Sequence, residues 1–206
     1  MCGRYFFDLE YDKLKRYYDQ VESKAADKDI RLAINEVFPS NHVVTLGINK
    51  ESEVVPGITR WGFEGFKKGQ LMINARSETV EEKKIFSKAF RDSRCIFPMS
   101  GFYEWDLNKQ KFFFKIKENS TLFIGGFYRI HKTETGFETE SIIMTTRPNT
   151  SVAPVHDRMP LIIERSSINE WLNNLEFARK YVTNEMPELE QIIIENKNGL
   201  QIQKHP

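Results

Sequence analysis

The stretch "RCIFPMSGFYEWDLNKQKFFFKIKENSTLFIGGFYRI" (Arg94–Ile130) decides the fold. It contains short runs rich in aromatic and β-branched residues, separated by polar connections such as "DLNKQK". Runs of this kind are typical of β-strands, and short polar connections between them favour antiparallel hairpins. We therefore predict successive strands at "RCIF" (94–97), "GFYEWDL" (101–107), "KFFFKI" (111–116) and "TLFIGGFYRI" (121–130).

The same pattern extends in both directions along the chain. Further strands are predicted at "CGRYFFD" (2–8), "HVVTLGI" (42–48), "EVVPGITRWGF" (53–63), "LMINAR" (71–76), "ESIIMTT" (140–146) and "QIQKH" (201–205). Connections are predicted at "SKAADKD" (23–29), "FKKGQ" (66–70), "HKTETGFET" (131–139) and "RPNTSVAPVHDRMP" (147–160). The last of these is a long loop, and long loops in compact domains are often functional.

Three helices complete the expected secondary structure. The first follows Asp8 as N-cap, the second runs from an N-cap at Ser77 to about Asp92, and the third covers "SSINEWLNN" (166–174). Strands and helices do not alternate regularly, which argues against a doubly wound sheet. We predict an α+β fold with a single domain over residues 1–206. Its core is a curved or barrel-like, mainly antiparallel sheet with a few flanking helices.

Composition sets limits on the function. Lys and Arg number 30 against 29 Asp and Glu, so a polyanion would need positive charge gathered on one face. Two cysteines make no disulfide framework, and no Cys/His spacing indicates a metal site, so neither metal nor cofactor is expected. The sequence shows no secretory signal and no apolar run long enough for a bilayer. We expect a cytoplasmic, monomeric protein without membrane contact.

Cys2 is the first chemical candidate. If Met1 is removed, Cys2 carries an α-amine and a thiol, which titrate near pH ~8 and ~8.5 in model peptides. Such a pair reacts with an aldehyde: the amine forms a Schiff base, and the thiol closes a thiazolidine ring that a lysine cannot form. An idle terminal residue is the alternative. Cys95 lies in an apolar run and is expected to be a buried structural thiol.

Acid/base candidates come from two other segments. Glu104 lies among aromatic residues in "GFYEW", where loss of hydration would raise its pKa; the alternative is a glutamate that faces solvent. His156 lies in the long loop, either as an acid/base group or as a surface histidine. Asn74 in "NARSET" offers a hydrogen-bond donor and acceptor that could hold a nucleophile, or serves only a turn.

Basic and aromatic residues accompany these candidates. Arg4, Arg76 and Arg158 each lie within two residues of one of them, which indicates phosphates near the chemistry. Trp61 and Trp105 are candidate stacking surfaces for bases, with core packing as the alternative.

Taken together and in order, "MCGR", "WGF", "NARSET", "RC..P..GFYEW" and "H.RMP" closely resemble the SOS response-associated peptidase (SRAP) family. The motifs span Cys2 to Pro160, whereas the segment 33–44, "AINEVFPSNHVV", departs from the family form "YN.AP.Q..PV". The resemblance implies the family's α+β fold around a barrel-like sheet. It also implies binding of single-stranded DNA with abasic sites, autoproteolytic exposure of the cysteine, and a thiazolidine crosslink that shields the lesion.

The resemblance also implies roles for individual residues. Cys2 is the nucleophile, Asn74 positions it, Glu104 transfers protons during ring opening and Schiff-base formation, and His156 is a second acid/base. Arg4, Arg76 and Arg158 would hold flanking phosphates. Two alternatives stay open: a cysteine peptidase or N-terminal-nucleophile hydrolase acting on other proteins, and a single-stranded DNA-binding module without catalysis.

Overall fold

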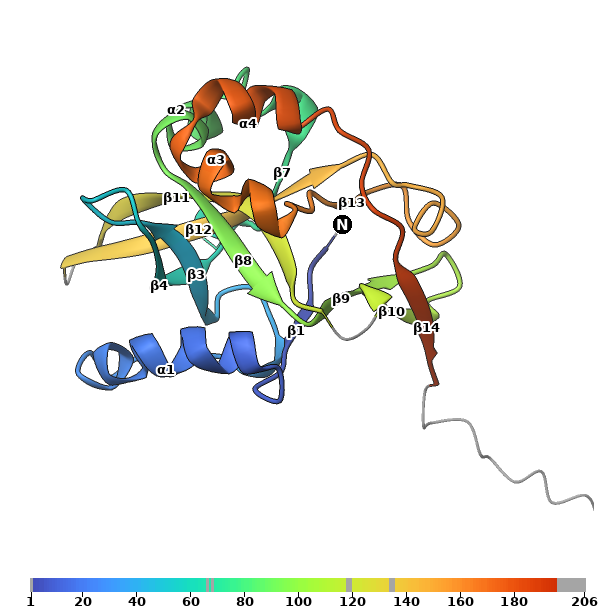
Figure 1. The fold of residues 1–206 in the computed structure, drawn as a ribbon, viewed down its shortest axis with the longest axis horizontal. Coiled ribbons are helices and arrows are strands. Elements are labelled where there is room, and N and C mark those ends of the chain that lie inside the picture. The colour runs from blue at the N-terminus through green and yellow to red at the C-terminus, as the bar shows by residue number, and fades with distance from the viewer. Residues whose placement is uncertain (1, 66, 68, 118–119, 134–135, 196–206) are drawn as a thin grey trace, which may run out of the picture.

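A computed structural model of the chain describes residues 2–65, 67, 69–117, 120–133 and 136–195 (Figure 1). Its largest sheet closes into a barrel, because the strands follow the order β11–β8–β3–β4–β12 and β12 pairs back with β11. Neighbouring barrel strands are antiparallel except β4 and β12, which are parallel. The bounds are β3 His42–Ile48, β4 Val54–Trp61, β8 Arg94–Met99, β11 Leu122–Thr133 and β12 Gly136–Thr146. The predicted α+β class with a barrel-like core is confirmed.

A second, antiparallel sheet lies beside the barrel and carries the N-terminal strand. Its order is β14–β10–β9–β1–β2. The bounds are β1 Tyr5–Phe7, β2 Asn35–Val37, β9 Gly101–Trp105, β10 Lys111–Lys115 and β14 Glu190–Ile194. In the β1–β9 register Tyr5 lies opposite Phe102, so the chain leading into β1 runs alongside the end of β9 that contains Glu104. This pairing fixes the position of Cys2.

Short strands extend these two sheets. β7 and β13 both pair with β12, and β5 pairs with β6. The bounds are β5 Phe63–Glu64, β6 Leu71–Met72, β7 Asn74–Arg76 and β13 Met159–Pro160. The predicted strand over 71–76 is therefore present as two pieces, and the second begins at Asn74.

Helices pack on opposite sides of the barrel, with α1 below it and α2, α3 and α4 above it in the view of Figure 1. The bounds are α1 Asp12–Ala26, α2 Lys84–Asp92, α3 Ile168–Asn173 and α4 Leu175–Tyr181, with 3-10 turns at Ser77–Thr79 and Arg165–Ser167. Among the described residues, no helix has both the length and the apolar character that crossing a bilayer requires.

Two predicted helix starts are wrong. The first helix begins at Asp12, because Asp8 instead closes a turn in which its side chain accepts the Glu10 N–H at 3.0 Å. The second begins at Lys84, because Ser77 opens a separate 3-10 turn in which its own hydroxyl is buried.

Two predicted connections need adjustment. The helix α1 continues to Ala26, so "SKAADKD" is partly helical. The strands β11 and β12 run through most of "HKTETGFET", whose tip at 134–135 lies outside the described residues. "QIQKH" (201–205) and residues 66 and 68 of "FKKGQ" also lie outside them.

Aromatic rings fill the space between barrel and helices. Phe127 contacts Phe63, Phe86 and Phe90 with ring centroids 5.7 to 6.4 Å apart, and Phe90 also contacts Trp171. At Gly126 the neighbouring strand comes so close that an added Cβ would lie 2.5 Å from the Ile142 carbonyl oxygen. The packed core makes the barrel a rigid support for the segments at its end.

Candidate active site around Cys2

Cys2 lies buried at the start of the chain, where strand pairing brings three distant segments together. The Asn74 side-chain N–H donates to the Cys2 carbonyl oxygen at 3.0 Å. Asn74 is held there because β7 pairs with β12, with Asn74 opposite Ile143. The predicted link between Asn74 and the nucleophile segment is therefore present as a direct contact with its backbone.

Glu104 lies on the buried face of β9 and is only 2% exposed. Phe102 and Glu104 alternate with Tyr103 and Trp105 along the strand, so Glu104 shares its side of the sheet with Phe102. Burial is the main cause that raises the pKa of Glu104 from 4.5 to about 7, and the nearby charge of Asp157 adds to it. A carboxyl with this pKa can both give and take a proton at neutral pH.

His156 approaches Glu104 from the long loop. Its Nε2 lies 4.0 Å from Glu104 Oε2, while the Arg158 backbone N–H donates to its Nδ1 at 3.0 Å. Asp157 Oδ1 lies 3.0 Å from the same Nδ1, so the loop holds the ring by this nitrogen and leaves Nε2 facing Glu104. Burial lowers the pKa of His156, which favours the neutral ring at pH 7.

The thiol of Cys2 shares this buried environment. Burial, reinforced by the charge of Glu104, raises the pKa of the Cys2 thiol above its usual range. The thiol is therefore neutral at pH 7, and a reaction through its sulfur needs a base beside it. Within the described residues, Tyr5 Oη and Asn74 Oδ1 are buried without a hydrogen-bond partner. These oxygens could meet the polar groups of a bound substrate.

The three predicted arginines occupy different environments. Arg158 is buried and binds both oxygens of Glu78, at 2.6 and 2.8 Å, and the Thr145 carbonyl oxygen at 2.7 Å. This ion pair ties the His156 loop to the turn at Ser77–Thr79, and the contact of Arg158 with a flanking phosphate stays a prediction. Arg76 is exposed at the end of β7. Arg4 is half-buried and binds Glu36.

The two tryptophans also differ. Trp61 is fully buried, with ring centroids 5.3 Å from Tyr5 and 6.5 Å from Phe97, and its indole N–H donates to the Ile73 carbonyl oxygen. No face of this ring reaches solvent, which corrects the expectation that Trp61 stacks on a base. Trp105 is partly exposed and retains an accessible ring.

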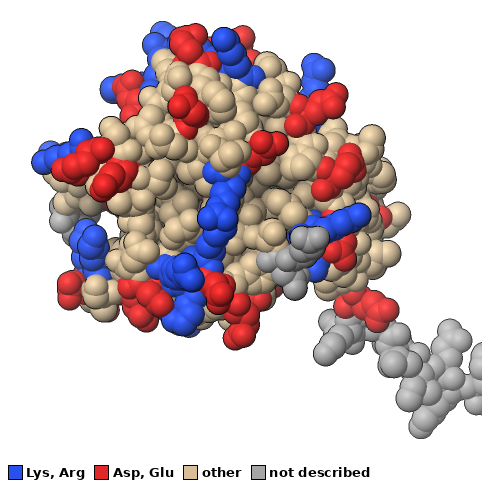
Figure 2. Space-filling model, viewed as in Figure 1, with Lys and Arg blue, Asp and Glu red and all other residues tan. Residues whose placement is uncertain are grey.

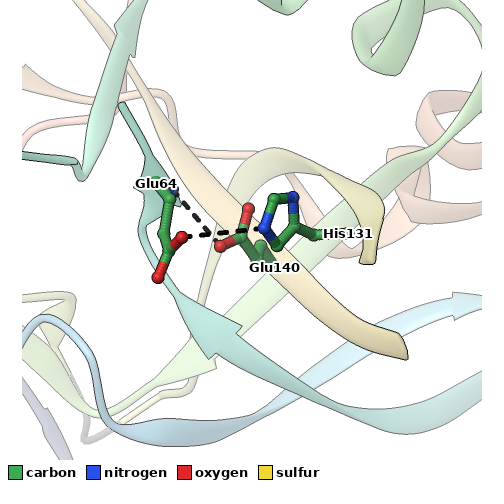
Figure 3. A group of neighbouring side chains, drawn as sticks. All are labelled: Glu64, His131 and Glu140. Atoms are coloured by element: carbon green, nitrogen blue, oxygen red, sulfur yellow. Dashed lines mark hydrogen bonds and ion pairs between the residues drawn. The ribbon is translucent and has the colours of Figure 1, made fainter. Parts of the chain in front are cut away.

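A second polar cluster lies on the barrel, away from Cys2 in sequence. Glu64, His131 and Glu140 bring side-chain ligand atoms within 4.8 Å of one another (Figure 3). The Glu140 carboxylate is however already bound by the guanidinium groups of Arg60 and Arg129. A divalent cation would have to compete with two positive charges, so we assign this cluster to a structural charge network.

On the face drawn in Figure 2, acidic and basic side chains are interspersed, with one short basic band near the middle. Cys95 is buried as predicted, and its carbonyl oxygen accepts the Trp171 indole N–H at 3.1 Å.

Comparisons with known proteins match this arrangement of motifs. A family model described as "SOS response associated peptidase (SRAP)" matches residues 1–196. The chain is 33% identical over 183 residues to the abasic site processing protein YoqW of Bacillus subtilis, covering 84% of this chain and 80% of that protein. It is 26% identical over 180 residues to the abasic site processing protein YedK of Escherichia coli, covering 84% and 79%.

A solved structure supports the fold independently. A crystal structure of a Bordetella bronchiseptica protein superposes with a TM-score of 0.76 and 17% identity, covering 95% of this chain and all of that one. At this identity the likeness concerns the fold alone.

Proposed function

The chain belongs to the SOS response-associated peptidase family, and on this premise we propose that it captures abasic sites in single-stranded DNA through Cys2. The relatives named above are abasic site processing proteins, which supports a DNA lesion as substrate. One observation carries the proposal: Cys2, Asn74, Glu104 and His156, from four separate segments, meet in one buried place.

Removal of Met1 is the first step. Hydrolysis of the Met1–Cys2 peptide bond uses one water, releases methionine and leaves Cys2 with a free α-amine beside its thiol. Asn74 holds the Cys2 carbonyl oxygen, which keeps the new N-terminal residue in place. Glu104, with its pKa of about 7, provides a base for the attacking water, so we propose that the protein performs this cleavage itself.

The crosslink then forms in two additions. The Cys2 amine attacks C1′ of the ring-opened deoxyribose aldehyde, and the resulting carbinolamine loses one water to give the imine. The thiol adds to the imine carbon, a C–S bond forms, and the proton from sulfur ends on nitrogen in a thiazolidine. No oxidant or reductant is required, because the only by-product of the two additions is water.

Glu104 and His156 divide the proton transfers. The acid form of Glu104 protonates the leaving hydroxyl, and its base form accepts the proton of the neutral thiol. His156 faces Glu104 through Nε2, and we assign it the second acid/base role in formation or reversal of the crosslink. Arg4 and Arg76 would hold the flanking phosphates and Trp105 would support a neighbouring base, while Arg158 and Glu78 hold the histidine loop.

The test uses single-stranded DNA with one abasic site. The processed protein should form an adduct that survives heating, and the Cys2→Ala variant should form none. Cys2→Ser keeps the amine and replaces the thiol by a poorer nucleophile, so its product should be an imine that is retained only after borohydride reduction. An equal heat-stable adduct with Cys2→Ala would refute the proposal.

The same samples separate the two alternatives. Cleavage of an unrelated peptide without any DNA adduct would indicate a peptidase. Salt-sensitive DNA binding without an adduct would indicate a binding module. The mass of the purified protein, measured beforehand, shows whether Met1 has been removed.

A further inference from the structure

A pair of cations beside the candidate active site shares a single carboxylate. Arg4 Nη1 lies 3.2 Å from Glu36 Oε1, and Lys111 Nζ lies 2.5 Å from the same oxygen. Arg4 directly precedes β1, Lys111 opens β10 and Glu36 lies on β2, so the pairing of the small sheet brings them together. Two positive charges that converge on one oxygen atom leave a local excess of positive charge.

Aromatic rings surround both cations. The Arg4 guanidinium lies 4.3 Å from the ring centroid of Phe38 and 5.1 Å from that of Trp105. Lys111 Nζ lies 3.9 Å from the ring centroid of Tyr103. Rings in such contacts hold the cations in place and keep their charge available on the open side.

This cluster is accessible to a ligand. The side chains of Arg4 and Glu36 are 31% and 33% exposed, and Phe38 is 40% exposed. Partial burial works to raise the pKa of Glu36, but hydrogen bonds and charges from Lys111 and Arg4 outweigh it and lower that pKa. Glu36 is therefore ionised at neutral pH and occupies the cations as an internal anion.

Glu36 and Phe38 also lie in the segment 33–44, where this sequence departs from the family form. The side chains of Arg4 and Glu36 are about one third exposed and that of Lys111 is 17% exposed, so an incoming anion can reach the pair from the Arg4 side and compete with Glu36. A phosphodiester flanked by bases offers both the charge that suits the cations and flat faces that suit the rings.

We propose that Arg4 and Lys111 form a phosphate-binding subsite for single-stranded DNA, that Glu36 occupies it in the free protein, and that Phe38 stacks on an adjacent base. The proposal rests on the proposed function, since it places this subsite next to Cys2 on the path of the lesion-bearing strand. It makes Lys111 and Phe38 DNA-contacting residues and makes Glu36 a competitor of the phosphate.

The test measures binding of a fluorescent oligothymidylate without any abasic site, which separates affinity from crosslinking. Glu36→Gln removes the competing charge and keeps the shape, so affinity should rise about fivefold at ~0.1 M salt. Lys111→Gln should weaken binding about fivefold and reduce the salt slope by about 0.7, the value for one phosphate contact on a single strand. Glu36→Gln should raise DNA affinity less in the Lys111→Gln background than in the wild type, because one of the two cations that Glu36 occupies is then absent.

Two controls make the result specific. Asp92→Asn removes the carboxylate of an exposed pair with Lys88 on α2 and should change affinity less than twofold. Phe38→Ala should weaken binding of oligothymidylate, but not of a strand of base-free tetrahydrofuran nucleotides.

The outcomes distinguish this proposal from the proposed function. Unchanged or weaker binding by Glu36→Gln, in a protein whose wild type still forms the heat-stable adduct, overturns the subsite and leaves the function intact. Absence of the adduct in the wild type overturns the function itself. If Asp92→Asn raised DNA affinity as much as Glu36→Gln does, the gain would come from the net charge of the protein, and this would also overturn the subsite.

Discussion

Two buried glutamates, Glu104 and Glu140, show how neighbours decide what a buried carboxyl does. Both are almost completely inaccessible, at 2% and 0%. Glu140 lies between the guanidinium groups of Arg60 and Arg129, which compensate its charge. Glu104 lies beside Cys2 and His156, and its pKa rises to about 7. Burial with compensation makes a structural anion, whereas for the carboxyl buried beside a thiol and a neutral imidazole we propose an acid/base role.

The substitution Glu104→Gln tests most directly whether Glu104 transfers protons. It keeps the shape but removes proton transfer, so we expect the crosslinking rate to fall about 10³-fold, within the range of general acid/base catalysis. DNA affinity should remain within about twofold, because glutamine keeps the shape of the buried side chain and the proposed phosphate and base contacts lie on other residues. Single-turnover adduct formation on a denaturing gel measures the rate. A parallel loss of affinity would mean that Glu104 supports the binding surface instead.

The corresponding substitution of the other buried glutamate, Glu140→Gln, should lower the stability of the fold. It leaves Arg60 and Arg129 partly uncompensated in a buried place, so the free energy of unfolding should fall by about 3 to 4 kcal/mol. Denaturant titration measures this loss. Crosslinking by the folded protein at low temperature should be nearly unchanged.

The control for that experiment is Glu176→Gln. Glu176 pairs with Arg179 on α4, but its side chain is 71% exposed, so less than about 1 kcal/mol should be lost. A similar loss for both variants would contradict the structural role given to the buried network.

The sequence predicted the positions of the strands better than the environment of the Glu104 side chain. Alternation and aromatic runs predicted the barrel strands, because sheet periodicity is local. Sequence alone left open whether Glu104 faces solvent, since that depends on which face β9 packs against the rest of the fold. The edge strand β14 was missed, and the stretch chosen in its place lies outside the described residues.

Sequence motifs identified the main candidate residues of the site, but their further neighbours follow only from the way the strands pair. Nothing local in "NEVFPS" places Glu36 against Arg4 and Lys111, because that contact needs β2, β1 and β10 to lie in one sheet. Asp157 and Tyr5 were likewise not singled out. Tyr5 matters because it is buried near Cys2, and Asp157 because its charge acts on Glu104 and His156 from an exposed position; no residue spacing reveals either.

The pH dependence of the free energy of unfolding provides a separate test of the raised pKa of Glu104. Glu104 has a folded-state pKa of about 7 against 4.5 in the unfolded chain, so the folded state binds more protons between these values. The stability of the wild type relative to Glu104→Gln should be greatest below pH 4.5. It should fall by about 3 kcal/mol as the pH rises through 7, and then level off.

Denaturant titrations of both proteins from pH 4 to pH 8 measure this difference. Glu176→Gln serves as the reference, because it makes the same chemical change at a side chain that is 71% exposed. A constant difference between the wild type and Glu104→Gln would show that the carboxyl is not protonated in the folded state near neutral pH.

The smallest effect is expected at Asn74, which holds the backbone of Cys2 rather than exchanging protons. Asn74→Ala removes one hydrogen bond to the Cys2 carbonyl oxygen, so crosslinking should slow about tenfold, equivalent to about 1.4 kcal/mol. The matched control is Asn173→Ala, whose amide bonds only to Asn169 in its own helix and should leave the rate unchanged. A loss at Asn74 as large as that at Glu104 would place the amide among the groups that touch the reacting atoms. The distinction between proton transfer and positioning in this site would then fail.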